Sequence, residues 1–142
     1  MTKIKVLFIC NYNSARSQIA EALLKKLGGE KFEVESAGLE PGTLNPLAVE
    51  AMKEIGIDIS RNKTKSAFGF FKQGKTYDYV ITVCDESRAG SCPVFPGAGE
   101  NIHWSLPDPS SFTGTKAEKL AKTRAVRELI EQKIKEGLLT PR

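Results

Sequence analysis

The most informative stretch of this sequence is VLFICNYNSARS, which runs from Val6 to Ser17. The run from Val6 to Ile9 is continuously apolar, as expected of a strand that is buried on both faces of a parallel sheet. From Ser17 onward the apolar residues recur with helical spacing, and Gly28-Gly29 ends the pattern. The polar face of this predicted helix carries Gln18, Glu21, Lys25 and Lys26. A loop therefore joins the end of a buried strand to the beginning of an amphipathic helix.

The rest of the chain continues to alternate between strand and helix patterns. Further strands are expected at Phe32 to Ser36, Tyr77 to Val83 and Asn101 to Ser105, and further helices at Leu44 to Ile55, Thr64 to Phe71 and Ala117 to Lys135. This order implies an α/β fold with parallel crossovers. Glycine and proline are dense between Gly90 and Gly99, where a loop without a long regular element is expected.

Length and composition limit the classes of protein to consider. The 142 residues are expected to form a single domain over 1–142. A composition of 40% hydrophobic and 27% charged residues is typical of a globular protein with a packed core. The net charge of +4 is compatible with an anionic substrate but is too small to indicate nucleic-acid binding. No apolar run approaches the roughly 20 residues needed to cross a bilayer, and no secretory signal precedes the first strand. We expect a cytoplasmic monomer that binds neither nucleic acid nor membrane.

Cysteine and histidine restrict the chemistry further. With His103 as the one histidine and no CxxC pair, the sequence predicts no metal site. Cys10, Cys84 and Cys92 form an odd set of thiols. In a cytosolic protein static disulfides are rare, so such thiols are buried, metal-bound or reactive.

The loop itself has the pattern C-x5-R-S, from Cys10 to Arg16-Ser17. Backbone N–H groups at the beginning of a helix, together with the helix dipole, attract a tetrahedral oxyanion. Arg16 can bind two of its oxygens, and the same positive field favours the thiolate of Cys10, which makes it a nucleophile. Asn13 tolerates the left-handed backbone that a tight loop demands. The residues expected to bind the oxyanion are Asn11, Tyr12, Asn13, Ser14, Ala15, Arg16 and Ser17. The alternative is that Cys10 is a buried core thiol and Arg16 a solvated helix residue.

Several segments carry a resemblance to a known family. They are Cys10-x5-Arg16-Ser17 with Gln18 to Glu21, Glu35 to Gly38, Gly56 to Ser60, Tyr77-Asp78 before the strand that ends at Cys84, and Asp108-Pro109. Over nearly its whole length the chain resembles the low-molecular-weight protein tyrosine phosphatase superfamily, and within it the arsenate reductases that are recycled by thioredoxin. The resemblance implies a doubly wound sheet of four parallel strands with flanking helices and a site at the carboxyl ends of the strands.

The same resemblance implies roles for the three thiols. In such arsenate reductases Cys10 would form a covalent adduct with arsenic, Cys84 would attack Cys10 to release arsenite, and Cys92 would attack Cys84. Thioredoxin, an external reductant, would then reduce the Cys84–Cys92 disulfide, so no bound cofactor is expected. In a phosphatase of the family, Cys10 would instead attack phosphorus while Arg16 binds the phosphoryl group and Asp108 protonates the leaving group.

The presence of two further thiols favours the reductase, because phosphate ester cleavage requires only one cysteine, Cys10. Cys84 closes a predicted strand and so shares a sheet edge with Cys10. A helix between Cys84 and Cys92 would separate them by about 12 Å, whereas a disulfide needs Cα atoms within roughly 7 Å, so this segment must loop or unwind. The alternatives are a phosphatase, a non-catalytic oxyanion-binding or redox-sensing module, and a chain in which Cys84 and Cys92 are incidental.

The chain also departs from its family. Tyr12 stands where the family usually has Gly, and Ala15 replaces a common second Cys. Some members bind potassium through positions that match Asn13, Glu21 and Ser36, but the Asp that completes such a site is matched near Lys65. This substitution argues against a potassium site.

Overall fold

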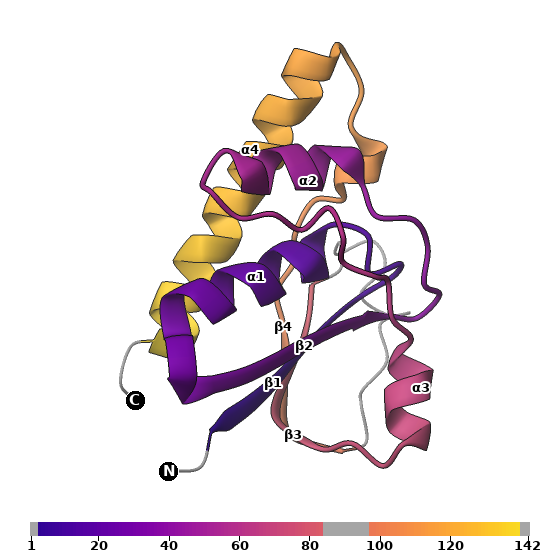
Figure 1. Ribbon diagram of the computed structural model, residues 1–142, viewed down its shortest axis with the longest axis vertical. Coiled ribbons are helices and arrows are strands. Elements are labelled where there is room, and N and C mark those ends of the chain that lie inside the picture. The colour runs from indigo at the N-terminus through magenta and orange to yellow at the C-terminus, as the bar shows by residue number, and fades with distance from the viewer. Residues whose placement is uncertain (1–2, 84–96, 140–142) are drawn as a thin grey trace.

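A four-stranded parallel sheet forms the centre of the computed structural model, which describes residues 3–83 and 97–139 (Figure 1). The strands are β1 (Ile4–Cys10), β2 (Phe32–Gly38), β3 (Tyr77–Thr82) and β4 (Ala98–His103). They lie in the order β2-β1-β3-β4, and each neighbouring pair is parallel. Because β1 lies in the interior of the sheet, Val6 to Ile9 have no exposed surface, which explains their unbroken apolar run. The doubly wound α/β fold is confirmed.

Helices cover the sheet on both faces. The helical elements are α1 (Arg16–Gly28), η1 (Gly29–Lys31), α2 (Pro46–Lys53), α3 (Ala67–Lys72), η3 (Pro109–Ser111), α4 (Lys116–Ile134) and η4 (Lys135–Leu139). In Figure 1, α1, α2 and α4 stack together on one side of the strands, while α3 lies apart from them. None of the helices in the described part of the chain is long and apolar enough to span a membrane.

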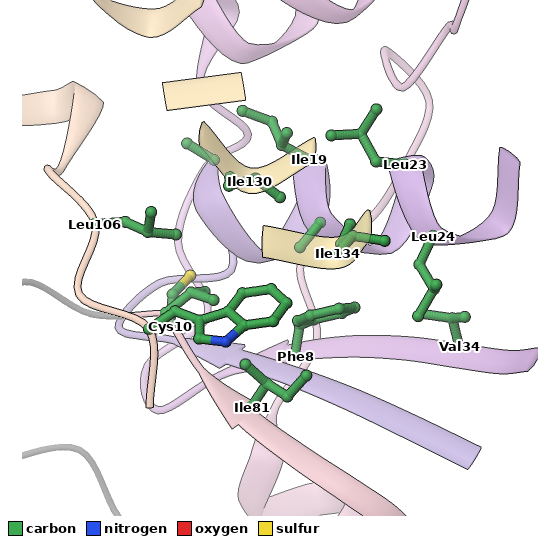
Figure 2. Close-up of a cluster of buried hydrophobic side chains, with 14 of the residues drawn as sticks. Phe8, Cys10, Ile19, Leu23, Leu24, Val34, Ile81, Leu106, Ile130 and Ile134 are labelled. Carbon is green, nitrogen blue, oxygen red and sulfur yellow. The ribbon is translucent and has the colours of Figure 1, made fainter. Parts of the chain in front are cut away.

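Alternate residues of β1 serve the two faces of the sheet. Val6, Phe8 and Cys10 belong to the larger core under α1, α2 and α4, whereas Leu7 and Ile9 belong to a smaller one with residues of α3. Figure 2 shows the larger core, where side chains of α1 and α4 meet the strands and the Cys10 sulfur lies at its edge. The nucleophile candidate therefore sits where the main core ends.

Some boundaries differ from the expected ones for local reasons. The second long helix begins at Pro46, not Leu44, because the Asn45 side chain caps it by accepting a hydrogen bond from Leu47 N at 2.9 Å. The last strand begins at Ala98, not Asn101, and runs through Gly99. A Cβ atom at Gly99 would lie 2.9 Å from the Asp78 carbonyl oxygen, so glycine permits the close approach to β3.

Candidate functional site

The loop that carries the C-x5-R-S pattern lies at the carboxyl end of the sheet. Cys10 is the last residue of β1, and Arg16 is the first residue of α1. The segment after β2 packs against the loop, and its N–H groups donate to the carbonyl oxygens of Cys10 (3.2 Å), Asn11 (2.9 Å) and Tyr12 (3.0 Å). These carbonyl oxygens are thus turned toward the neighbouring segment. These hydrogen bonds hold the loop from the outside, in a shape that suits binding of an anion by the N–H groups of the loop.

Close packing behind the loop requires glycine in β2. A Cβ atom at Gly38 would lie 2.7 Å from both Asn13 N and the Tyr12 carbonyl carbon. The Tyr12 side chain points out of the loop and is 39% exposed. Tyr12, where the resemblance leads us to expect Gly, therefore does not fill the interior of the loop.

The Cys10 sulfur is nearly enclosed and has two polar neighbours. The residue is 2% exposed, its sulfur accepts a hydrogen bond from Asn13 N at 3.1 Å, and Ser17 Oγ lies 2.9 Å away. Hydrogen bonds donated to sulfur favour a negative charge on it. The sulfur at the end of β1 is thus held beside a backbone N–H and the hydroxyl of Ser17 in the first turn of α1.

Asn13 holds the loop in shape. Its φ of +55° makes it the one non-glycine residue with left-handed backbone in the part of the chain that the structure describes. Its side-chain amide donates to Ser17 Oγ at 2.7 Å and Ser36 Oγ at 2.9 Å. Its side-chain oxygen accepts from Gln18 Nε2 at 3.0 Å and Lys65 N at 2.9 Å. Hydrogen bonds from several elements therefore keep Asn13 in a left-handed backbone conformation, which is costly for residues other than glycine.

Arg16 and Asp108 meet across the mouth of the loop. Arg16 is 4% exposed, and its guanidinium donates to the Leu106 carbonyl oxygen at 3.2 Å and lies 3.6 Å from the Asp108 carboxylate. The other Asp108 oxygen accepts hydrogen bonds from Ser110 N at 2.9 Å and Ser110 Oγ at 2.8 Å. The structure thus brings Asp108 to Arg16, at the end of the loop that begins after Cys10. Cys84 and Cys92 lie outside the described residues.

Two polar residues of the first helix are buried, contrary to expectation. Gln18 and Glu21 were expected on the solvated face of the first helix, yet Gln18 has no exposed surface and Glu21 is 7% exposed. Gln18 donates to Asn13 and to the Lys63 carbonyl oxygen, so the loop before α3 covers it. Helical spacing separates polar from apolar positions but gives no sign of which loop packs on the polar side.

Glu21 is surrounded by donors. It accepts a hydrogen bond from Ser36 Oγ, its Oε2 lies 2.6 Å from Lys25 Nζ, and its Oε1 lies 3.2 Å from Lys65 Nζ. Burial alone would raise the pKa of Glu21, but the hydrogen bonds from Lys25 and Ser36 and the charge of Lys65 outweigh it, so the pKa lies below its ordinary value.

This cluster does not fit a potassium ion. The Glu21 carboxylate already faces two ammonium groups, those of Lys25 and Lys65. In the described ranges, no three residues among His, Cys, Asp and Glu gather to hold a metal ion. A cation added at this carboxylate would be repelled by the ammonium groups of Lys25 and Lys65.

Comparison with known proteins agrees with this geometry. Residues 5–140 match the family described as low molecular weight phosphotyrosine protein phosphatase. An arsenate reductase of Halalkalibacterium halodurans is 43% identical over 135 residues, which cover 95% of each chain. A solved structure of an arsenate reductase in the phosphate-binding state has a TM-score of 0.76 at 33% identity and covers 94% of this chain and 95% of that chain. A thioredoxin-dependent arsenate reductase of Corynebacterium glutamicum has a TM-score of 0.62 at 31% identity and covers 94% of this chain and 63% of that one.

These matches extend over the sheet and its helices as well as the loop after β1. Because the family match alone spans residues 5–140, the agreement is not confined to a short motif. The chain belongs to the low molecular weight phosphotyrosine protein phosphatase family.

Proposed function

We propose that this protein is an arsenate reductase. The observation that carries the proposal is the Cys10 sulfur, which accepts a hydrogen bond from Asn13 N and lies beside Ser17 at the beginning of α1. Arg16 begins the same helix and offers a planar pair of donors to a tetrahedral oxyanion. The relative from H. halodurans, named an arsenate reductase, supports arsenate rather than a phosphate ester as the substrate.

The first step is a substitution at arsenic. The Cys10 thiolate forms a bond to arsenic while an arsenate oxygen leaves as water, and Asp108 beside Arg16 supplies a proton. Arg16 binds the remaining oxygens and offsets their charge. This step changes no oxidation state, so the reduction requires a second thiol.

Cys84 and Cys92 supply the two electrons. Cys84 attacks the Cys10 sulfur, the sulfur–arsenic bond breaks, and its electron pair stays with arsenic, which leaves as arsenite. Cys92 then attacks Cys84 and releases Cys10, and the dithiol of thioredoxin reduces the resulting Cys84–Cys92 disulfide. Support for this relay comes from the presence of both cysteines in the sequence and from the thioredoxin dependence named for the C. glutamicum relative.

A phosphatase is the second candidate function. It is favoured by Asp108, whose carboxylate lies 3.6 Å from the Arg16 guanidinium and could protonate a leaving alcohol. Phosphate ester hydrolysis would need Cys10, Arg16 and Asp108 and neither of the other thiols.

The two functions separate in a paired assay of arsenate-dependent thioredoxin oxidation and aryl-phosphate hydrolysis. Cys10→Ser should abolish both activities, because a serine hydroxyl is not ionised at neutral pH. Cys92→Ser should release one equivalent of arsenite in a burst and then stop as a Cys10–Cys84 disulfide, with any aryl-phosphate hydrolysis unchanged.

Continuous arsenate turnover by Cys92→Ser, or the absence of any disulfide in arsenate-treated wild type by mass spectrometry, would contradict the relay. If aryl phosphate is hydrolysed under those conditions, the protein is a phosphatase. If neither substrate reacts, it is an oxyanion-binding or redox-sensing module.

A further inference from the structure

Glu21 is the only acidic side chain that is buried among the residues described, at 7% exposed. A buried carboxylate requires hydrogen-bonded and charged partners, because otherwise the loss of hydration strongly disfavours its ionised form. The two oxygens of Glu21 have different partners. Oε2 pairs with Lys25, which follows one turn later on α1, whereas Oε1 is shared by Ser36 of β2 and Lys65 of the loop before α3.

A directed chain of hydrogen bonds leads from this oxygen to the nucleophile. Ser36 gives its hydroxyl proton to Glu21, so its oxygen is free to accept from the Asn13 amide at 2.9 Å. The same amide group donates to Ser17 Oγ at 2.7 Å, which leaves the Ser17 proton free for the Cys10 sulfur at 2.9 Å. The negative charge of Glu21 therefore fixes the donor at each link: Ser36 donates to Glu21, and Asn13 donates to Ser36 and Ser17. The Ser17 hydroxyl then donates to the Cys10 sulfur.

Lys65 contacts this series of hydrogen bonds at two points, Glu21 and Asn13. Its side chain reaches Glu21 at 3.2 Å, and its backbone N–H donates to the Asn13 side-chain oxygen at 2.9 Å. Its carbonyl oxygen accepts from Gly38 N at 2.8 Å, which ties the residue to the end of β2. Lys25 makes no contact of this kind with Asn13, and its side chain is 57% exposed against 32% for Lys65.

We infer that the Lys65 ammonium acts as a built-in cation that positions Asn13, and with it the oxyanion loop, through Glu21 and Ser36. Lys65 is a positioning residue, because it contacts Glu21 and Asn13 rather than the reacting atoms. Since the Lys65 ammonium offsets the charge of Glu21 as part of the protein itself, oxyanion binding should need no alkali cation. The inference rests on the proposed oxyanion site around Cys10 but not on the thiol relay.

The test measures the affinity for inorganic phosphate in a Cys84→Ser/Cys92→Ser background, where iodoacetamide can alkylate Cys10 alone. Protection of Cys10 by increasing phosphate gives the dissociation constant. Lys65→Met should raise this constant about tenfold, the scale expected from the loss of one charge-assisted hydrogen bond. Lys65→Arg should restore binding to within about threefold, because it keeps the charge.

Lys25→Met is the matched control, since it removes the same charge from the other oxygen of the same carboxylate. It should bind phosphate within about threefold of the parent. Exchange of sodium for potassium at equal ionic strength should leave phosphate affinity of the parent protein unchanged. Thermal melting of each variant checks that it is folded.

Three results would overturn the inference while leaving the oxyanion site intact: unchanged affinity in Lys65→Met, an equal loss in Lys25→Met, or a potassium requirement in the parent. If phosphate fails to protect Cys10 even in the parent protein, the oxyanion site itself is wrong and the inference fails with it.

Discussion

Arg16 is held at the site by two contacts from a single loop. One is the Leu106 carbonyl oxygen at 3.2 Å, and the other is the Asp108 carboxylate at 3.6 Å. Asp108 also begins η3 by accepting a hydrogen bond from Ser110 N. An oxyanion that binds to Arg16 must therefore share the guanidinium with this carboxylate. The same residue can help the reaction as a proton donor and oppose binding as a competing anion.

Asp108→Asn tests both roles. We expect aryl-phosphate hydrolysis to slow by roughly 10²–10⁴-fold, as is usual when a general acid is lost. Arsenate reduction should slow less, because a departing water requires less help than an alkoxide or phenolate. Phosphate affinity should rise by about twofold to tenfold, since the competing charge is gone.

Isothermal titration with phosphate and parallel kinetics check these expectations. Asparagine keeps the capping oxygen, so the melting temperature should hardly change. Weaker phosphate binding, or equal losses in the two kinetic assays, would show that the role of Asp108 is assigned incorrectly.

At the scale of elements, α2 is fastened to α4 through Glu54, the residue that follows α2. Its carboxylate accepts hydrogen bonds from Arg124 at 2.8 and 2.6 Å and from Arg127 at 3.0 Å. Arg127 also donates to the Ala51 carbonyl oxygen at 2.6 Å. The Arg124 hydrogen bonds are the main reason that the pKa of Glu54 falls to about 2, and Arg127 adds to the effect.

Glu54→Gln should destabilise the protein in a pH-dependent way. The pKa of Glu54 is lower in the folded protein than its ordinary 4.5, so ionised Glu54 stabilises the fold above pH 4.5. This stabilisation is lost as the pH falls through the folded value of about 2. The difference in melting temperature between wild type and variant should thus be largest near neutral pH and shrink below pH 4.5.

Thermal melts across this range measure the difference. Glu50→Gln is the control, because Glu50 of α2 pairs with Lys116, whose side chain is 76% exposed, and such pairs contribute little. A difference for Glu54→Gln that stays constant with pH would contradict the proposed ionic link.

At the scale of the whole molecule, the stability of the fold and the shape of the site depend on one core. Ile130 and Ile134 of α4 are fully buried against α1 and the sheet, and the Cys10 sulfur lies at the edge of the same cluster (Figure 2). Helix α4 closes this core although it lies more than 100 residues after β1 in the sequence. Its packing therefore supports the loop from the far end of the sequence.

Ile130→Ala should lower the free energy of unfolding by about 2–5 kcal/mol, because it leaves a cavity in this core. Leu129→Ala is the matched control on the neighbouring position. Leu129 is 36% exposed, so its loss should be below about 1 kcal/mol. Urea unfolding of the two variants measures the difference, and similar losses would mean that α4 does not close the core as described.

The local frame of this protein could be predicted from the sequence alone. The apolar run of β1, the loop after it and the helical period of α1 are signals from adjacent residues, and they place Cys10 and Arg16 at the two ends of one loop. The left-handed conformation of Asn13 was predictable for the same reason, since it depends on residue type and a tight turn. Patterns of this kind survive because backbone sterics and burial act on neighbouring residues.

The segments that cover the loop and the polar side of α1 are set by long-range packing. Asp108 meets Arg16, and Ser36 and Lys65 meet Glu21, across long stretches of sequence. Periodicity shows that a residue is polar and on which side of a helix it lies. Whether that side faces water or a buried network depends on which distant segment packs there, and this is a property of the folded chain alone.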